Sequence, residues 1–271
     1  MTTLQLYNAD CLIQMKSIPD KSIDLIICDL PYGCLKGGGN RKNKILKSVN
    51  GVLTDKTIEA GYTEGCMWDI KIDLVLFWKE IKRIRKNYNT PALFFCSTKF
   101  GVELINSNPK EFRYDLIWNK MKGVGFLSAN RKPMTSHEMI YVFAKQGANY
   151  NRIDDIEGKP YVKKSKNKMS EQYYLTKRTA STNTGTRCVL SVLDYYNTSG
   201  HIGKQHPTAK PISLYKWLIE RYSNAGDVVL DPTAGSFNSG VASKELGRNY
   251  IGIEMNKEFY DKANALFSTN V

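Results

Sequence analysis

The sequence predicts an α/β fold, because apolar runs of strand length alternate with a segment of helical periodicity. Residues 23–28 and 92–96 are nearly continuous apolar runs, which is typical of parallel strands buried on both faces. Between them, apolar residues recur at helical spacing over residues 74–84. A strand, a helix and a second strand in succession form the repeating unit of a parallel sheet covered by helices.

The remaining strands of this sheet are predicted by shorter runs. Residues 4–7 form a first strand, and residues 228–230 and 250–253 give two more near the C-terminus, with helices on either side. Residues 114–118 and 139–143 are two apolar runs joined by a basic, glycine-containing segment, so we expect them to pair antiparallel at one edge of the sheet.

Two segments depart from this α/β pattern. Residues 33–67 are rich in Gly, Lys and Asn, which predicts a long irregular insert that serves as a functional loop or lid. Residues 145–210 contain 12 Lys and Arg against 5 Asp and Glu, and so carry +7 of the total net charge of +13. We expect this basic stretch to form a separate unit.

The composition narrows the class of protein. A net charge of +13 on 271 residues favours a polyanionic partner, with nucleic acid as the leading candidate. No apolar run approaches the ~18 residues that would span a bilayer, so we expect a cytoplasmic protein without a membrane partner. The six cysteines form no Cys-x-x-Cys pair and only three histidines are present, so no metal site is expected.

The first motif with chemical meaning directly follows the buried strand 23–28. It reads Asp29-Leu30-Pro31-Tyr32, at the carboxyl end of a strand, where ligands of α/β sheets usually bind. The proline restrains the residue before it, so the Asp29 carboxylate and the Leu30 carbonyl can point together at one amino group. On its own, the same tetrapeptide is about as well explained as a strand-to-turn transition.

A second motif follows the strand 228–230. Asp231-Pro232-Thr233-Ala234-Gly235-Ser236 is a turn of small residues before a predicted helix, and it would let the backbone approach a nucleotide-like ligand closely. Glu254 follows 23 residues after Asp231, at the end of the next strand, where an acidic side chain can bind ribose hydroxyls. The pair of motifs indicates a cofactor that contains adenosine.

With both motifs in place, the chain resembles the amino-methyltransferases of DNA, which modify adenine N6 or cytosine N4. The catalytic signature of that family matches Asp29, Leu30, Pro31 and Tyr32, with Leu30 in place of a commoner proline. The resemblance implies S-adenosylmethionine as cofactor, S-adenosylhomocysteine as product, and a Rossmann-like doubly wound sheet with an antiparallel edge strand. Its cofactor-binding residues here would be Asp10, Cys11, Lys210, Asp231, Pro232, Thr233, Gly235, Ser236 and Glu254.

Two positions differ from the usual cofactor motif of this family. Thr233 stands where Phe is usual, and Phe237 stands where the last Gly is usual. A bulky Phe237 is expected close to the methionine moiety, where it would affect cofactor binding. The resemblance extends to a sheet-edge region that includes Trp118-Asn119-Lys120 and His137-Glu138, and we expect His137 to be a buried core residue.

The catalytic motif precedes the cofactor motif, with the basic stretch between them, an order that resembles the beta-type permutation of the family. The resemblance implies a catalytic half at residues 1–145, a target-recognition domain at 146–204 and a cofactor-binding half at 205–271. The target would be double-stranded DNA, held by positive charge and read by a few side chains. Candidate DNA-binding residues are Lys163, Lys164, Lys166, Lys168, Lys177 and Arg178.

The predicted function is therefore site-specific DNA methylation, with adenine N6 preferred and cytosine N4 as the alternative. The methyl group would be transferred in line to a base flipped out of the duplex, with stacking on Tyr32 offsetting the cost of extrusion. A cognate restriction endonuclease is a possible partner, and the chain is expected to be a monomer or a homodimer. The alternative of another class is a non-catalytic DNA-binding protein on a degenerate methyltransferase fold, suggested by Phe237.

Overall fold

The computed structural model describes residues 2–33, 42–49, 52–59, 71–164, 180–196 and 209–268. By its contacts the chain divides into a large unit, Met1–Tyr150 with Val192–Val271, and a small unit, Asn151–Ser191. The small unit therefore begins and ends inside the predicted recognition domain 146–204. Residues 192–194 of that predicted domain belong instead to the sheet of the large unit.

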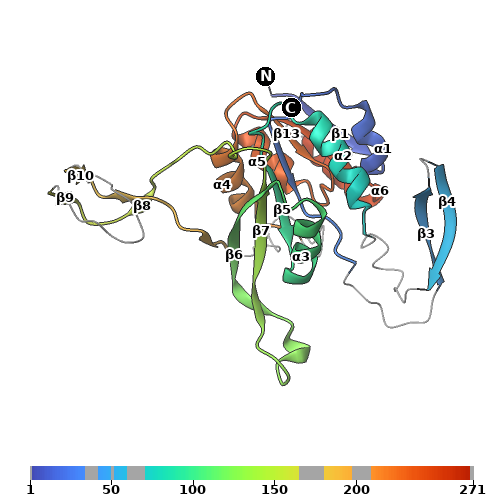
Figure 1. Cartoon of the computed structure of the whole chain (residues 1–271), viewed down its shortest axis with the longest axis horizontal. Coiled ribbons are helices and arrows are strands. Elements are labelled where there is room, and N and C mark those ends of the chain that lie inside the picture. Colours follow the sequence, from blue (N-terminus) through green and yellow to red (C-terminus); the bar gives the residue numbers. More distant parts are fainter. Residues whose placement is uncertain are drawn as a thin grey trace. The chain divides into compact units, whose positions relative to one another are not determined.

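An eight-stranded sheet forms the centre of the large unit (Figure 1). Its order is β1-β14-β13-β2-β5-β7-β6-β12, and every neighbouring pair is parallel except those made by β7. The Rossmann-like fold class is thus confirmed, and the antiparallel strand is followed at that edge by β6 and the short β12. The strands are β1 (Leu4–Asn8), β2 (Leu25–Cys28), β5 (Ala92–Cys96), β6 (Phe112–Val124), β7 (Thr135–Phe143), β12 (Val192–Asp194), β13 (Val228–Asp231) and β14 (Asn249–Glu254).

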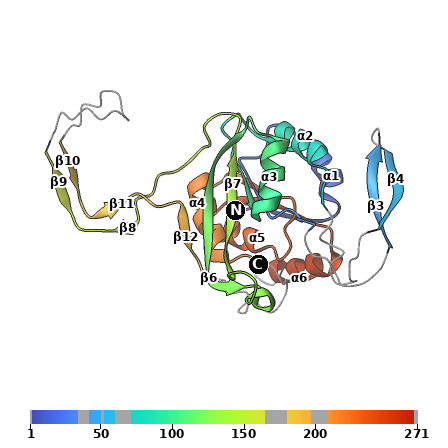
Figure 2. The ribbon, with the colours of Figure 1, turned by 60° about the horizontal axis from the view of Figure 1, so that its bottom comes forward.

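Helices cover both faces of the sheet, as Figure 2 shows. One core cluster joins the sheet to α1 (Cys11–Gln14), α2 (Leu74–Ile84) and α3 (Thr98–Ser107). The other joins it to α4 (Ile212–Tyr222), α5 (Asn238–Glu245) and α6 (Lys257–Ser268). The central strands β2 and β5 are buried along their whole length, which explains why their sequences are continuous apolar runs.

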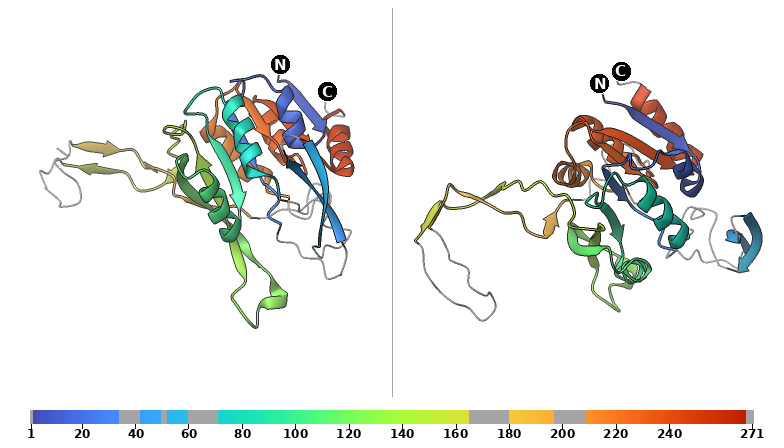
Figure 3. Two further views of the ribbon diagram at one scale, coloured as in Figure 1. Left: turned by 45° about the vertical axis from the view of Figure 1, so that its right-hand side comes forward. Right: turned by 45° about the horizontal axis from the view of Figure 1, so that its top comes forward.

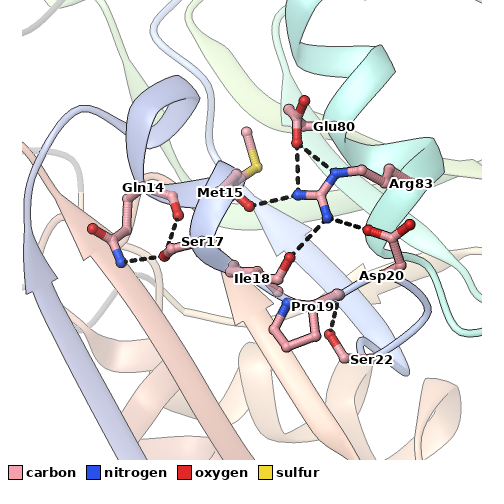
Figure 4. A network of polar contacts seen from close by, with 9 residues as sticks. All are labelled: Gln14, Met15, Ser17, Ile18, Pro19, Asp20, Ser22, Glu80 and Arg83. Atoms are coloured by element: carbon pink, nitrogen blue, oxygen red, sulfur yellow. Dashed lines mark hydrogen bonds and ion pairs between the residues drawn. The ribbon is translucent and has the colours of Figure 1, made fainter.

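Arg83 on α2 fixes the connection between β1 and β2 (Figure 4). Its guanidinium donates to the carbonyl oxygens of Met15 and Ile18, at 2.7 and 2.8 Å, and also to the carboxylates of Asp20 and Glu80. Met15 lies in a short 3-10 turn, η1 (Met15–Ser17), whose backbone is thereby tied to the helix. This anchor holds in place the segment that leads into β2 and the tetrapeptide Asp29-Leu30-Pro31-Tyr32, which was predicted to be catalytic.

Antiparallel strand pairs account for the two inserts as far as the structure describes them. In the predicted irregular insert 33–67, β3 (Lys42–Val49) pairs with β4 (Val52–Glu59), so the expectation of an irregular segment is wrong for these residues. In the small unit, β8 (Ile156–Glu157) pairs with β11 (Thr186–Arg187), and β9 (Tyr161–Lys163) with β10 (Ser181–Asn183). Among the described residues, no helix combines the length and apolar character needed to cross a bilayer.

Candidate active site

Four neighbouring parallel strands bring acidic side chains to the same edge of the sheet. In the order of the strands, Asp10 follows β1, Glu254 ends β14, Asp231 ends β13 and Asp29 follows β2. All four strands run in one direction, so their carboxyl ends meet. A concentration of carboxylates in a protein of net charge +13 marks a site for a ligand that carries positive charge or hydroxyl donors.

Asp29 is held from three sides. Its backbone carbonyl accepts a hydrogen bond from the Thr233 hydroxyl at 3.2 Å, which joins the catalytic tetrapeptide to the cofactor turn. One carboxylate oxygen accepts from the Tyr32 hydroxyl at 2.6 Å, and the other from the Lys210 ammonium at 2.5 Å. Burial raises the pKa of Asp29 above its usual range, against the opposing effect of Lys210, and the nearby Glu138 carboxylate adds to the rise.

Lys210 is a buried cation between two carboxylates. Besides Asp29, its ammonium contacts Glu138 at 3.2 Å and lies 5.3 Å from the centre of the Phe95 ring. Burial alone would lower the pKa of Lys210, but Asp29 and Glu138 outweigh it and raise the pKa. The Lys210 carbonyl accepts from the Asn238 amide at 2.7 Å, which ties this segment to α5. Lys210, predicted to bind cofactor, thus lies against the carboxylate of the predicted catalytic residue Asp29.

Glu138 and Lys120 complete this charged group, and neither was among the predicted site residues. The Lys120 ammonium donates to Glu138 at 2.5 Å from the neighbouring strand. Burial opposes ionisation of Glu138, but Lys210 and Lys120 hold its pKa below the usual range. His137 is exposed, so the expectation of a buried histidine is wrong; successive side chains of a strand point to opposite faces, and Glu138 is the one directed inward.

We call this chain of contacts the charged network, defined as Lys120, Glu138, Lys210 and Asp29. Sequence reasoning placed Lys120 and Glu138 in the sheet-edge region but could not pair them, because the pairing depends on the register of β6 and β7. In that register Trp118 faces Glu138 and Asn119 faces His137. A signal was available in the sequence, since Lys120 closely follows one predicted strand region, 114–118, and Glu138 directly precedes the strand 139–143 that was expected to pair with it.

Tyr32 and Leu30 occupy different environments within the tetrapeptide. The Tyr32 ring stacks on Phe100 with the ring centres 5.2 Å apart, and this contact fixes its plane. Burial and the neighbouring Asp29 raise the pKa of the Tyr32 hydroxyl well above its usual value, so it donates to Asp29 as a neutral phenol. The Leu30 side chain is buried in the core on the α2 side of the sheet, and Pro31 follows it at the surface of the site.

The cofactor turn is organised by its own acidic residues. Asp231 is buried and accepts from the Ser239 hydroxyl at 2.6 Å and from the Thr233 amide at 3.1 Å. Burial raises the pKa of Asp231 to about 7. Glu254 accepts from the Gly235 amide at 2.8 Å, and from the Asn256 amide through its other oxygen at 2.6 Å. The predicted Pro232 is buried in this turn and Ser236 is partly exposed.

Phe237 does not lie where its position in the motif suggested. Its side chain is fully buried in the core between the sheet and α4 to α6. The ring fills the space above Gly252, where an added Cβ would come within 2.7 Å of it. Its backbone takes the left-handed conformation, with φ of 56°, that a glycine would adopt more easily. The expectation that the ring crowds the methionine moiety is therefore wrong.

The first strand contributes Asp10 and Cys11. The Asp10 carboxylate accepts from the backbone amides of Leu12 and Ile13, so it caps α1 and is held at the sheet edge. Cys11 is buried, and burial raises the pKa of its thiol to about 12, which leaves it unreactive. The Ala9 amide donates to the Glu254 carbonyl at 3.2 Å, so the ends of β1 and β14 lie side by side.

The predicted DNA-binding residues belong to the small unit. Lys163 ends β9 and Lys164 follows it, and both are exposed. The Lys163 ammonium lies 4.9 Å from the centre of the Tyr161 ring. Lys166, Lys168, Lys177 and Arg178 lie outside the residues that the structure describes.

The cofactor end fits the chemistry of S-adenosylmethionine, which carries ribose hydroxyls, an ammonium and a sulfonium. Carboxylates suit all three groups, and Asp10 and Glu254 supply accessible ones at the ends of the adjacent strands β1 and β14. The predicted Asp231 is buried and holds the turn itself, through Ser239 and Thr233. The turn at Gly235 has a positive φ of 52°, which glycine adopts without steric cost, and the absence of a side chain lets the backbone approach a ligand there. The burial of Phe237 keeps its ring out of this approach.

Comparison with known proteins agrees with this site. The family model described as DNA methylase (N6/N4) matches residues 23–265. The DNA adenine methyltransferase YhdJ of Escherichia coli is 28% identical over 93% of this chain and 78% of its own length. The solved structure of an M1.HpyAVI complex with S-adenosylmethionine has a TM-score of 0.60, 20% identity and coverage of 98% and 99%. The cytosine-N4-specific PvuII DNA methyltransferase has a TM-score of 0.65, 15% identity and coverage of 97% and 86%.

The family match spans both the catalytic tetrapeptide and the cofactor turn, which the fold brings together at one edge of the sheet. The two solved structures share the fold over nearly the whole chain. This chain therefore belongs to the N6/N4 family of DNA methylases, which depends on S-adenosylmethionine.

Proposed function

We propose that the chain methylates the N6 amino group of adenine in double-stranded DNA. The observation that carries the proposal is the position of Asp29, tethered through its carbonyl to the cofactor turn and through its carboxylate to Tyr32 and Lys210. Adenine is favoured over cytosine because an Asp at the first motif position resembles the adenine enzymes of the family, and because the curated relative YhdJ is named an adenine methyltransferase.

The cofactor would be held by the carboxylates at the ends of β1 and β14, together with the backbone of the turn that Asp231 holds. Asp10 and Glu254 would accept from its hydroxyl or ammonium groups, and Gly235 would allow the main chain to come close. When bound, S-adenosylmethionine supplies an electrophilic methyl group. The tether between Thr233 and Asp29 then sets the distance between the cofactor turn and the group that holds the target.

Asp29 prepares the target nitrogen. The lone pair of an exocyclic amine is conjugated with the ring, so the amine is a poor nucleophile. The Asp29 carboxylate and the Leu30 carbonyl accept its two hydrogens, which favours a pyramidal nitrogen with a localised lone pair. Each carboxylate oxygen has two lone pairs, so Asp29 can accept this bond while keeping those from Tyr32 and Lys210.

As positive charge develops on the nitrogen, the Asp29 carboxylate stabilises it electrostatically. Its raised pKa also suits it to take up the proton that the nitrogen must lose. Lys210 and Glu138 act as positioning residues, since Lys210 holds the Asp29 carboxylate in one orientation and is itself held by Glu138.

The target base would have to leave the duplex to reach this site, at a cost of a few kcal/mol. The basic small unit, Asn151–Ser191 with its predicted Lys163 and Lys164, would contact the DNA and contribute recognition. A cognate restriction endonuclease stays a prediction from the sequence.

The test is to express the chain in cells that lack adenine methylation and to identify modified nucleosides in their DNA by mass spectrometry. N6-methyladenine is the expected product, and sequencing that detects the modification gives the site. N4-methylcytosine would assign the alternative base. DNA that stays unmodified, although the purified chain binds S-adenosylmethionine, would contradict the proposal and favour a non-catalytic DNA-binding protein.

A further inference from the structure

The hairpin formed by β6 and β7 extends well beyond the sheet (Figures 1 and 3). It starts at the site, because Lys120 and Glu138 of the charged network stand where its two strands leave the core. Phe126 at the tip follows Lys120 by six residues, most of them in β6, which corresponds to a reach of at most about 20 Å. The hairpin is therefore an arm whose base lies at Asp29 and whose tip lies outside the core.

The tip of this arm is a built turn that displays apolar side chains to solvent. It contains the 3-10 turn η3 (Phe126–Ser128), entered through Gly125 with a φ of 91°. The amides of Ser128 and Ala129 donate to the carbonyls of Gly125 and Phe126, at 2.9 Å each. Within this ordered turn the Phe126 side chain is 77% exposed and Leu127 is completely exposed.

Two adjacent large apolar residues that an ordered turn exposes to solvent indicate a binding surface. The charge of the arm indicates the kind of partner that binds there. Residues 121–137 contain Lys122, Arg131 and Lys132 and no Asp or Glu, and all three cations are exposed. A second copy of this chain would bring the same positive charges against them, whereas a DNA backbone would neutralise them.

We propose that the arm is a DNA wedge, with Phe126 and Leu127 entering the base stack beside the extruded base. This inference rests on the proposed function. Extrusion leaves a gap in the duplex, and apolar side chains that insert between base steps compensate part of the lost stacking. Lys122, Arg131 and Lys132 hold the flanking phosphates, and the base of the arm connects the wedge to the charged network that orients Asp29.

The test compares the wild type with the double variant Phe126→Ala and Leu127→Ala on a synthetic duplex that carries the site mapped by sequencing. The matched control is Val75→Ala with Val102→Ala, two exposed apolar residues on α2 and α3. We expect kcat/KM to fall at least tenfold in the wedge variant and less than twofold in the control. Cofactor affinity should be unchanged in both.

A duplex with a mismatch at the target base makes the test specific for extrusion. A mismatched base costs less to unstack, so the wedge variant should recover most of its activity there. Equal loss on matched and mismatched duplexes, or no loss on either, would overturn the proposal. The proposal would also be overturned if the wild type sediments as a dimer and the wedge variant as a monomer, because the tip would then contact a second copy. If the wild type itself modifies no DNA, it is the proposed function that has failed.

Discussion

The two ends of the acidic sheet edge are held by different kinds of contact. At the cofactor end, Asp10 and Glu254 are held by backbone amides within their own loop or an adjacent one. At the target end, Asp29 is held by the nearby Tyr32 and by two side chains distant in sequence, Lys210 and Thr233, which lie 181 and 204 residues further along the chain. The cofactor end thus depends on local turns, whereas the target end depends on a buried ion network that only the complete fold assembles.

The largest structural effect should come from Lys210→Met, which removes the cation at the centre of the target end. Two largely buried carboxylates would lose their shared, fully buried partner, so we expect a loss of up to about 3–5 kcal/mol in the free energy of unfolding. Denaturant unfolding measures it. The control is Lys216→Met, which breaks an exposed ion pair with Glu245 and should cost less than about 1 kcal/mol. Similar losses in the two variants would show that the network is not a special feature of the target end.

A smaller effect is expected from Glu138→Gln, which keeps the shape of the network and removes one negative charge. Because the Glu138 carboxylate raises the pKa of Asp29, its removal lowers that pKa. The acidic limb of the kcat profile should therefore move to lower pH, with kcat at its plateau reduced roughly tenfold and cofactor affinity unchanged. Glu103→Gln, at an exposed pair with Lys71, is the control. An acidic limb that does not move would show that Glu138 does not influence the pKa of Asp29.

A pH-dependent effect should appear at the cofactor end, in the stability of Asp231→Asn. The pKa of Asp231 is raised by burial to about 7, so the folded state binds a proton that the unfolded state has released. This contribution to stability is complete below the unfolded pKa and is lost as pH rises through about 7. Relative to wild type, the variant should therefore gain stability between pH 5 and pH 8. A stability difference between the variant and the wild type that does not change with pH would contradict the raised pKa of Asp231.

The two ends of the acidic sheet edge also differ in how far they could be predicted from the sequence. The catalytic tetrapeptide and the cofactor turn each follow a buried apolar strand, so their place at the sheet edge follows from the pattern alone. The two-sided sheet and the antiparallel pair were likewise predictable from apolar runs. These features depend on a few consecutive residues.

The target end could not be predicted in the same way. The contact of Lys210 with Asp29, and that of Lys120 with Glu138, depend on strand register and on the return of a distant segment. Phe237 was misplaced because a motif position does not reveal that Gly252, on the neighbouring strand, leaves room for its ring. The hairpin β3–β4 was missed because its strands contain four Lys residues and only short apolar runs, and because the surrounding residues are rich in Gly and Asn.

The central claim is that the Asp29 carboxylate holds the target amino group while the cofactor end works independently of it. The most direct measurement is single-turnover methyl transfer by Asp29→Asn, with cofactor affinity determined by calorimetry on the same preparation. The account predicts a fall in the transfer rate of roughly 100- to 1,000-fold, with cofactor affinity within about twofold of wild type. A variant that transfers methyl groups within a few-fold of the wild-type rate would contradict it.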